Sequence, residues 1–337
     1  MLIWNPLYEV TFGDRDLLFR SECELIQLQR PSRMNSWGIL HELNKGVVAS
    51  EGASSAAEWA LITFLLKKAL VVVLPDHQVG TPIDRCTGHF LSFTSSPITA
   101  LRRLREARVC ILGLGGVGSI VLQHLVGAGI RRYVLVDKDQ VEASNLNRQF
   151  VYSNCDVGRM KVDACKSYIA SRHDDFEVST YATSIESVEC LASRRLEACQ
   201  LIVHCLDTPR SLIDDVVYSF GAERKIAVTT AAVGVEFGHW GPIISSNGRI
   251  SFKEWKAQFR GTREGGLQQN NEPTPWSFGP TNTLISANLA RDCIEWLAGS
   301  RRVASVDARL VQCFANNKVY RYGVSQECQQ EGSPCVA

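Results

Sequence analysis

The spacing of apolar residues changes near residue 107 of this chain. Ahead of that point, short apolar runs with strand character alternate with turn-forming residues, and two longer segments repeat apolar residues at helical spacing. This mixture predicts a small α+β domain over residues 1–80. Its expected elements are strands at 7–12, 16–21, 22–28 and 70–75 and helices at 36–46 and 55–70.

Beyond residue 107 the pattern becomes a regular alternation of apolar strands and amphipathic helices. The strands are almost continuously apolar, as in parallel sheets that helices cover on both faces. We therefore predict an α/β domain over 107–325 with a Rossmann-like, doubly wound, mainly parallel sheet. Its expected elements are strands at 108–113, 131–137, 177–183, 201–207 and 225–233, helices at 118–130, 156–173, 191–200, 210–223 and 283–300, and a hairpin of 308–314 with 318–323.

Three segments interrupt these patterns. Residues 81–106 form a linker followed by a first helix, and 326–337 form a polar tail that we expect to be flexible. Residues 234–283 are rich in Gly, Pro and Asn and show no regular period, which predicts a long crossover loop. Loops of that length in compact domains are usually functional or disordered.

Composition narrows the classes of function. The 337 residues have a formal net charge of +1, so no strong field favours nucleic acid or an anionic membrane. No apolar run is long enough to span a bilayer, and the first residues lack the basic start and apolar centre of a secretion signal. We expect a cytoplasmic protein that binds neither nucleic acid nor a membrane. The 12 cysteines include no CxxC pair, so we expect no zinc site.

A glycine-rich loop, GLGGVG, joins the first strand of the α/β domain to the helix that follows. Glycine lets the backbone turn tightly and approach a phosphate without a Cβ in the way, and the helix N-terminus adds free N–H groups. Asp137 ends the next strand, about where an acid binds a ribose hydroxyl. The alternative is a tight strand-to-helix turn without a ligand, but strand, helix and acid together favour a nucleotide site. Its candidate glycines are Gly113, Gly115, Gly116 and Gly118.

The next polar segment, DKDQVEASNLNRQ, bears on which nucleotide binds. Hydride transfer with NAD has no evident need for a fixed Arg and Asn there, whereas a triphosphate does. Arg148 could clamp phosphate oxygens through its planar guanidinium, and Lys161 could reach the same anion. Asp207 ends a later strand at the carboxyl edge of the sheet, where an acid could hold Mg²⁺. Each group alone is better explained as a surface charge or a helix cap, but four such groups at the ends of successive elements together favour a phosphate site. The further nucleotide-binding candidates in this segment are Asp137, Asp139, Asn145 and Gln149.

Four motifs in this order resemble the ubiquitin-activating-enzyme-like superfamily of adenylating enzymes. They are GLGGVG (113–118), DKDQVEASNLNRQ (137–149), VGRMKVD (157–163) and CLDT (205–208), and the resemblance covers 107–315. It implies an enzyme that uses ATP and Mg²⁺, in which a carboxylate attacks the α-phosphate to give an acyl adenylate and pyrophosphate. The roles that it implies are Gly116 near the phosphates, Asp137 on the ribose, Asn145, Arg148 and Lys161 on the triphosphate, and Asp207 on Mg²⁺.

The sequence departs from the superfamily pattern in three places. The two CxxC pairs that bind a structural zinc ion in many relatives are missing. No cysteine lies between Cys205 and Cys293, which argues against thioester transfer to a thiol of the crossover region. Many relatives have an Arg upstream of the first strand that reaches into the partner subunit's site. Here the register puts Gly88 or His89 at that position, and we expect the nearby Arg85 in that catalytic role. Because superfamily members are usually dimers, we expect a homodimer.

The order of elements in residues 1–80 resembles the winged-helix-like peptide-clamp domains of enzymes that modify ribosomally made peptides. In those domains a leader peptide adds to a sheet edge. A clamp fused to an adenylating domain is similar to relatives that act on the precursor peptides of microcin C and pantocin A. The resemblance implies activation of a carboxylate on a precursor peptide in peptide-antibiotic biosynthesis, with a Glu side chain that is then cyclised or dehydrated.

Three alternatives stay open. The first is an adenylyltransferase for the C-terminus of a ubiquitin-like sulfur-carrier protein, which the missing crossover cysteine and zinc pairs disfavour. The second is a non-enzymatic nucleotide-binding partner, which the retained Arg148, Lys161 and Asp207 disfavour. The third is an NAD-dependent oxidoreductase, which has no evident use for the segment after Asp137.

Overall fold

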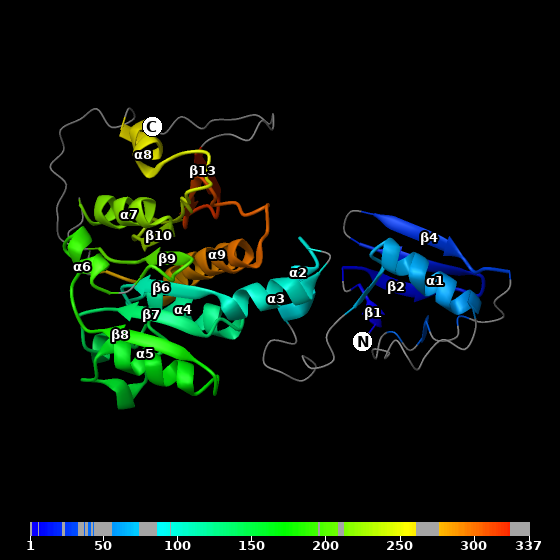
Figure 1. The fold of residues 1–337 in the computed structure, drawn as a ribbon, viewed down its shortest axis with the longest axis horizontal. Coiled ribbons are helices and arrows are strands. Elements are labelled where there is room, and N and C mark those ends of the chain that lie inside the picture. The colour runs from blue at the N-terminus through cyan, green and yellow to red at the C-terminus, as the bar shows by residue number, and fades with distance from the viewer. Residues whose placement is uncertain are drawn as a thin grey trace. The chain divides into compact units, whose positions relative to one another are not determined.

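The computed structural model describes residues 2–5, 7–21, 24–32, 37, 40–41, 43, 56–73, 86–94, 96–194, 196–207, 212–260 and 276–323. The chain divides into two compact units (Figure 1). The first comprises Met1–Arg105, Gly127–Gly129 and Glu295–Arg302, and the second comprises Glu106–Val126, Ile130–Ile294 and Val303–Ala337.

Two small sheets and a helix form the N-terminal part of the first unit. The elements are β1 (Leu2–Trp4), β2 (Glu9–Phe12), β3 (Asp16–Arg20), β4 (Leu25–Gln29), α1 (Ala56–Lys67) and β5 (Val71–Val73). β2, β3 and β4 form one antiparallel sheet, whereas β1 pairs antiparallel with β5. Leu17 and Phe19 of β3 are fully buried, together with Ile62 and Leu65 of α1. β1 was not predicted, because three residues are too few to show a period. The helix expected at 36–46 lies largely outside the described residues.

The segment expected to be a linker followed by a first helix contains two helices, α2 (Thr87–Phe90) and α3 (Pro97–Glu106), and α3 lies where that helix was expected. α3 begins at a proline, which has no backbone N–H and is therefore well tolerated in the first turn of a helix. Its buried residues Ala100, Leu101 and Leu104 recur at helical spacing, while its arginines lie on the other side.

The second unit is built on one eight-stranded sheet with the order β13-β12-β11-β10-β9-β6-β7-β8. Its strands are β6 (Arg108–Leu112), β7 (Arg132–Val136), β8 (Glu177–Tyr181), β9 (Leu201–His204), β10 (Ala227–Val233), β11 (Phe237–Trp240), β12 (Ala308–Cys313) and β13 (Val319–Gly323). Pairing is parallel from β8 to β10 and antiparallel from β10 to β13. The predicted Rossmann-like, mainly parallel α/β fold is confirmed.

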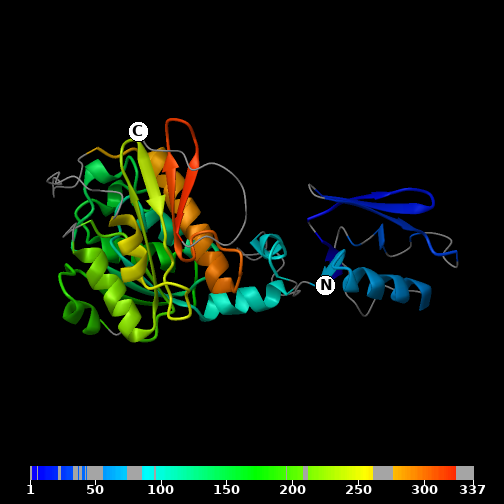
Figure 2. The ribbon, with the colours of Figure 1, turned by 90° about the horizontal axis from the view of Figure 1, so that it is seen from above.

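Helices lie on both sides of this sheet (Figure 2). They are α4 (Gly118–Gly127), α5 (Lys161–Ala170), α6 (Val188–Ala192), α7 (Ile213–Arg224), α8 (Phe252–Arg260) and α9 (Gly279–Ala298). On one face, Cys110, Val134 and Ile202 of the strands pack in a core with residues of α6, α7 and α8. On the other face, Ile285 of α9 lies against Gly238 of β11, so closely that a Cβ there would overlap it.

The strand order reverses between β6 and β9. From β6 the chain proceeds outward to β7 and β8, and it then returns to place β9 on the other side of β6. In open α/β sheets, ligands bind outside the carboxyl ends of strands at such a reversal. The glycine loop follows β6 and Asp207 follows β9, so both lie at this point.

Three predicted elements differ from the structure. The helix expected at 156–173 begins only at Lys161, because Gly158 has a φ of +87° and Met160 forms a bridge with Gln140. The helix expected at 191–200 is the shorter and earlier α6, where the Ser187 hydroxyl accepts a hydrogen bond from the Cys190 N–H. The loop expected at 234–283 contains β11 and α8.

Candidate active site

The glycine loop turns directly against the end of β9. Gly113 has a φ of +86°, and a Cβ there would lie 2.8 Å from the Cys205 carbonyl oxygen. A Cβ at Gly118 would overlap the Gly113 carbonyl oxygen, whereas one at Gly115 would meet nothing within 4 Å. Gly113 and Gly118 are therefore required by the fold of the turn itself, and Gly115 leaves open space beside the backbone.

Two buried side chains hold the backbone of Leu114 inside this loop. The Leu114 N–H donates to Asp137 Oδ2 at 2.6 Å, and its carbonyl accepts from the Tyr152 hydroxyl at 2.8 Å. Burial raises the pKa of Asp137, and the Lys161 ammonium and two backbone N–H donors oppose that rise. Burial also raises the pKa of the Tyr152 phenol, which stays protonated and can donate. Asp137 thus shapes the loop in addition to the ribose role predicted for it.

Lys161 and Asp139 form an ion pair near this loop. Lys161 Nζ lies 2.9 Å from Asp139 Oδ2, and the Lys161 N–H donates to the Asp139 carbonyl. The Lys161 side chain is only 7% exposed, while the Asp139 side chain is 52% exposed. Sequence reasoning predicted that both residues bind the nucleotide. The structure adds that the exposed carboxylate pairs with the buried ammonium.

The polar segment 142–149 forms a short 3-10 helix, Ala143–Asn145, and a turn. Asn145 Oδ1 accepts from the Glu142 N–H at 3.1 Å, so this residue stabilises the turn. Arg148 Nη1 donates to the Ser144 carbonyl at 2.8 Å and to Asn147 Oδ1 at 2.9 Å. Gln149 is buried, and its Oε1 has no hydrogen-bond partner in the described part of the chain.

Helix α9 contributes residues that sequence reasoning missed. A Cβ at Gly116 would overlap Asn282 Oδ1, so this buried side chain lies against the loop. Asn282 Nδ2 donates to the Phe278 carbonyl at 2.7 Å and to Ser277 Oγ at 2.9 Å. A Cβ at Gly279 would lie 2.7 Å from the Asn147 carbonyl. The start of α9 therefore closes over both the glycine loop and the turn that contains Arg148.

Asp207 is exposed and lies just after β9. Mg²⁺ in nucleotide enzymes is usually bound by one or two carboxylates together with substrate phosphates. A carboxylate at the reversal point fits that donor set, because bound phosphates would supply the other oxygens. The residues described in the structure include no cluster of three or more His, Cys, Asp or Glu side chains that could hold a metal ion. Arg85 lies outside the described residues, so its predicted role stays a prediction.

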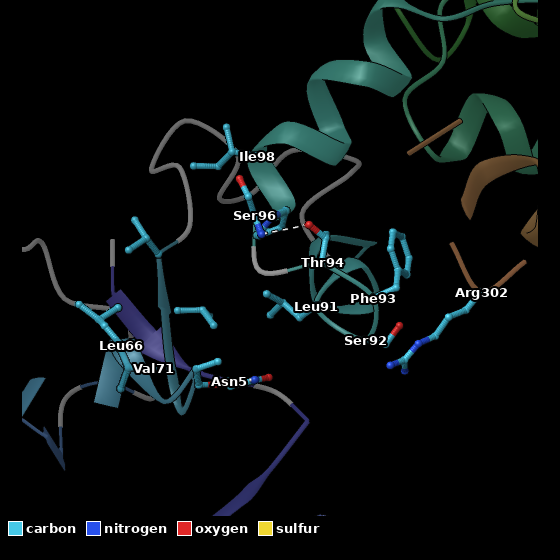
Figure 3. A pocket seen from close by; sticks show the side chains of 14 residues that line it. Asn5, Leu66, Val71, Leu91, Ser92, Phe93, Thr94, Ser96, Ile98 and Arg302 are labelled. Atoms are coloured by element: carbon cyan, nitrogen blue, oxygen red, sulfur yellow. Dashed lines mark hydrogen bonds between the residues drawn. The ribbon is translucent and has the colours of Figure 1, made fainter. Parts of the chain in front are cut away.

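A hollow of about 430 Å³ lies elsewhere, in the first unit (Figure 3). Leu66, Val71, Leu91 and Ile98 contribute to its lining, and Arg302 is the charged side chain among the described residues that line it. None of the predicted site residues that the structure describes contributes to it. We therefore place the candidate site at the sheet reversal and not in this hollow.

No helix in the described part of the chain is both long and apolar enough to cross a membrane.

The reversal point, the glycine loop and Asp137 define a nucleotide-binding α/β protein. Within this class of protein, one family matches the chain. The chain belongs to the ThiF family, whose model matches residues 91–335. The resemblance to adenylating enzymes inferred from the four motifs is thereby confirmed.

Curated relatives match part of the chain. An adenylyltransferase and sulfurtransferase, UBA4, of Eremothecium gossypii is 37% identical over 136 residues, which are 40% of this chain and 30% of that protein. The adenylyltransferase and sulfurtransferase MOCS3 of Aedes aegypti is 33% identical over 115 residues, which are 34% of this chain and 26% of that protein. The chain thus spans less than a third of the length of these relatives.

Solved structures share the fold over most of the chain. E. coli MccB with ATP superposes with a TM-score of 0.71 at 20% identity, over 97% of this chain and 98% of that chain. PaaA superposes with a TM-score of 0.66 at 21% identity, over 78% of this chain and 91% of that chain. These likenesses support the two-part architecture as a fold.

Proposed function

We propose that this protein is an ATP- and Mg²⁺-dependent enzyme that adenylates a carboxylate of a ribosomally made peptide. The observation that supports it most is the glycine loop at the sheet reversal, with its backbone fixed from both sides at Leu114. Such a loop presents backbone N–H groups and a helix N-terminus to phosphate oxygens. Family membership supports the same activity, since UBA4 and MOCS3 are named as adenylyltransferases.

In the proposed reaction a carboxylate oxygen of the substrate attacks the α-phosphorus of ATP. The bond from the α-phosphorus to the bridging oxygen breaks, and pyrophosphate leaves with its negative charge. Mg²⁺, held by Asp207, would supply charge neutralisation on the phosphates. Arg148 and Lys161 would bind phosphate oxygens, and Lys161 would exchange the Asp139 carboxylate for the triphosphate. Such catalysis depends on positioning and on charge stabilisation in the transition state.

The substrate class rests on the N-terminal unit. In the described part, β2 and β4 each pair with β3 alone, so each presents one edge to which a peptide strand could add. MccB, which shares the fold over nearly the whole chain, has been solved in complex with the peptide MccA. We propose a peptide whose activated carboxylate, such as a Glu side chain, is captured by a nitrogen with release of AMP. We also propose a homodimer, on the basis of the superfamily resemblance.

A second candidate is the adenylation of a sulfur-carrier protein at its C-terminus. It is favoured by the UBA4 relatives, which are named as both adenylyltransferases and sulfurtransferases. The two candidates share the ATP site and differ in the acyl substrate. Pyrophosphate release with a carrier ending in Gly-Gly, and none with peptides encoded beside the gene, would favour the carrier.

The test of adenylation is ATP-dependent pyrophosphate release by the purified protein with each class of substrate. We expect Lys161→Ala to lower the rate by about 100-fold or more, as when a charge-stabilising donor is removed. The matched control is Lys166→Ala, which changes an exposed lysine of the same helix and is expected to keep the wild-type rate. Equal rates for wild type and Lys161→Ala would contradict the proposal.

A further inference from the structure

A buried histidine lies at the end of β9, three residues before Asp207. The His204 side chain is fully buried, and both of its ring nitrogens have partners. The Leu206 N–H donates to Nδ1 at 3.3 Å, so this nitrogen is unprotonated. Nε2 then holds the proton and donates it to Asp214 Oδ1 at 3.0 Å. Both ring nitrogens thus have partners within the protein, which favours a structural role over proton exchange with a substrate.

The histidine connects two elements that flank residues 208–211. Leu206 directly precedes Asp207, and Asp214 lies in the first turn of α7. A Cβ at Gly113 would lie 3.3 Å from the Leu206 side chain, so the same residue also lies against the glycine loop. A shift of Leu206 would therefore move both the glycine loop and the predicted metal-binding carboxylate of Asp207.

Asp214 is a suitable anchor for the ring. Burial raises the pKa of its carboxyl, but the His204 hydrogen bond and the charges of the basic side chains around it outweigh this and lower it overall. The carboxylate is thus ionised and a strong acceptor for the Nε2 proton. A charged acceptor of this kind fixes both the tautomer and the orientation of an imidazole.

We propose that His204 is a positioning residue that, held by Asp214, fixes the backbone at Leu206 and with it the Mg²⁺-binding carboxylate of Asp207. This inference rests on the proposed function, because it assumes that ATP and Mg²⁺ bind at the reversal point. It assigns no catalytic step to His204. It predicts that disturbing the histidine weakens metal binding more than it weakens nucleotide binding.

Two variants separate the two hydrogen bonds of the ring. Asn in place of His204 puts an acceptor near the position of Nδ1, so H204N keeps the bond from the Leu206 N–H. Gln puts its amide nitrogen near the position of Nε2, so H204Q keeps the bond to Asp214 and loses the acceptor for Leu206. The control is H173Q, since His173 is another buried histidine whose Nε2 lies 2.9 Å from a backbone carbonyl, that of Val126.

The measurement is the equilibrium binding of Mn²⁺, in which the electron paramagnetic resonance signal of the free ion reports how much metal stays unbound. The protein also holds an ATP analogue that has a methylene bridge between the α- and β-phosphorus and so cannot react. We expect H204Q to bind Mn²⁺ about tenfold more weakly, the usual loss when a group that orients a metal ligand is removed. H204N should stay within about threefold of wild type, and H173Q should be unchanged. Binding of the analogue without metal should be the same in all four proteins.

Two results would overturn the inference. One is a wild-type Mn²⁺ affinity in H204Q. The other is an H204Q protein that loses affinity for the analogue without metal as much as it loses affinity for Mn²⁺, because a general structural role of the histidine would produce that result. If H204Q does not fold, H204A decides, because it also removes the acceptor for the Leu206 N–H. We expect the same roughly tenfold loss of Mn²⁺ affinity, and wild-type affinity in H204A would overturn the inference. Its control is H173A. Absence of analogue binding in the wild type would instead refute the proposed function, and the inference with it.

Discussion

The parallel and antiparallel halves of the large sheet differ in what their strand ends do. In the parallel half, β6, β7 and β9 all end at the same edge, and the glycine loop, Asp137 and Asp207 follow them there. In the antiparallel half, neighbouring strands end at opposite edges, so their loops do not gather. We accordingly place the proposed chemistry, which needs several groups at one point, on the parallel side.

The antiparallel half packs against α9 instead. Gly238 of β11 lies against Ile285, and Trp240 Nε1 donates to Asp292 Oδ2 at 3.0 Å. The other end of the same helix places Asn282 against the glycine loop. The two halves are therefore coupled through one helix, and changes in them should have unequal effects.

The largest effect is expected at the glycine loop of the parallel half. A Cβ at Gly118 would overlap the Gly113 carbonyl oxygen, which is backbone and has no room to move. Gly118→Ala should lower the free energy of unfolding by about 3 kcal/mol or more, in the range of strong steric defects, and abolish ATP binding. Gly127→Ala, at the other end of α4 where a Cβ meets nothing within 4 Å, should be neutral or stabilising. Denaturant unfolding compares the two, and equal losses would contradict the steric argument.

A smaller, pH-dependent effect is expected at His239 in the antiparallel half. Burial, together with the charge of Arg309, lowers the pKa of His239 to about 3. The unfolded chain takes up this proton near its ordinary pKa of 6.5, and the folded chain does so only near 3. Stability is therefore lost as the pH falls between these values, because the unfolded state binds more protons.

His239→Gln should flatten that acid decline by up to about 1.4 kcal/mol per pH unit. Urea unfolding of both proteins at several pH values between 7 and 4 measures the slope. Parallel curves would show that His239 is protonated as readily in the folded protein as in the unfolded one.

The smallest effect is expected on the exposed face of β11. Phe237 is 49% exposed, so Phe237→Ser should change the free energy of unfolding by less than about 0.5 kcal/mol. Trp240→Phe, on the same strand, should cost about 1–3 kcal/mol, because it leaves the buried Asp292 without the indole donor. Thermal unfolding of the pair tests this, and a comparable loss at Phe237 would indicate that something covers that face.

The parallel half could be predicted from the sequence, because its strands are continuous apolar runs joined by helices of ordinary length. The glycine loop and Asp137 could be predicted for the same reason, since both follow such strands directly. β11 could not, because it has four residues, one of them glycine, and only alternate burial. α8 has a readable signal in the reciprocal capping of Ser251 and Glu254, which the surrounding polar residues obscured.

Contacts within the site were harder to predict than its location. The pairing of Lys161 with Asp139 depends on the bridge between Gln140 and Met160, which brings two turns together. Asn282 and Gly116 are far apart in the sequence, and no local pattern of apolar and polar residues predicts their contact. His204 reads as one more position of a buried strand until the structure shows Asp214 beside it.

The clamping of Leu114 has a consequence for the timing of nucleotide binding. Its amide hydrogen is bonded to a buried carboxylate and its carbonyl to a buried phenol, so the loop becomes ordered when the domain folds. The Leu114 amide should therefore exchange with solvent deuterium as slowly as the core strands do, with or without ligand. A nucleotide that arrives at such a loop loses little affinity to ordering it, and the encounter need not wait for the loop to close.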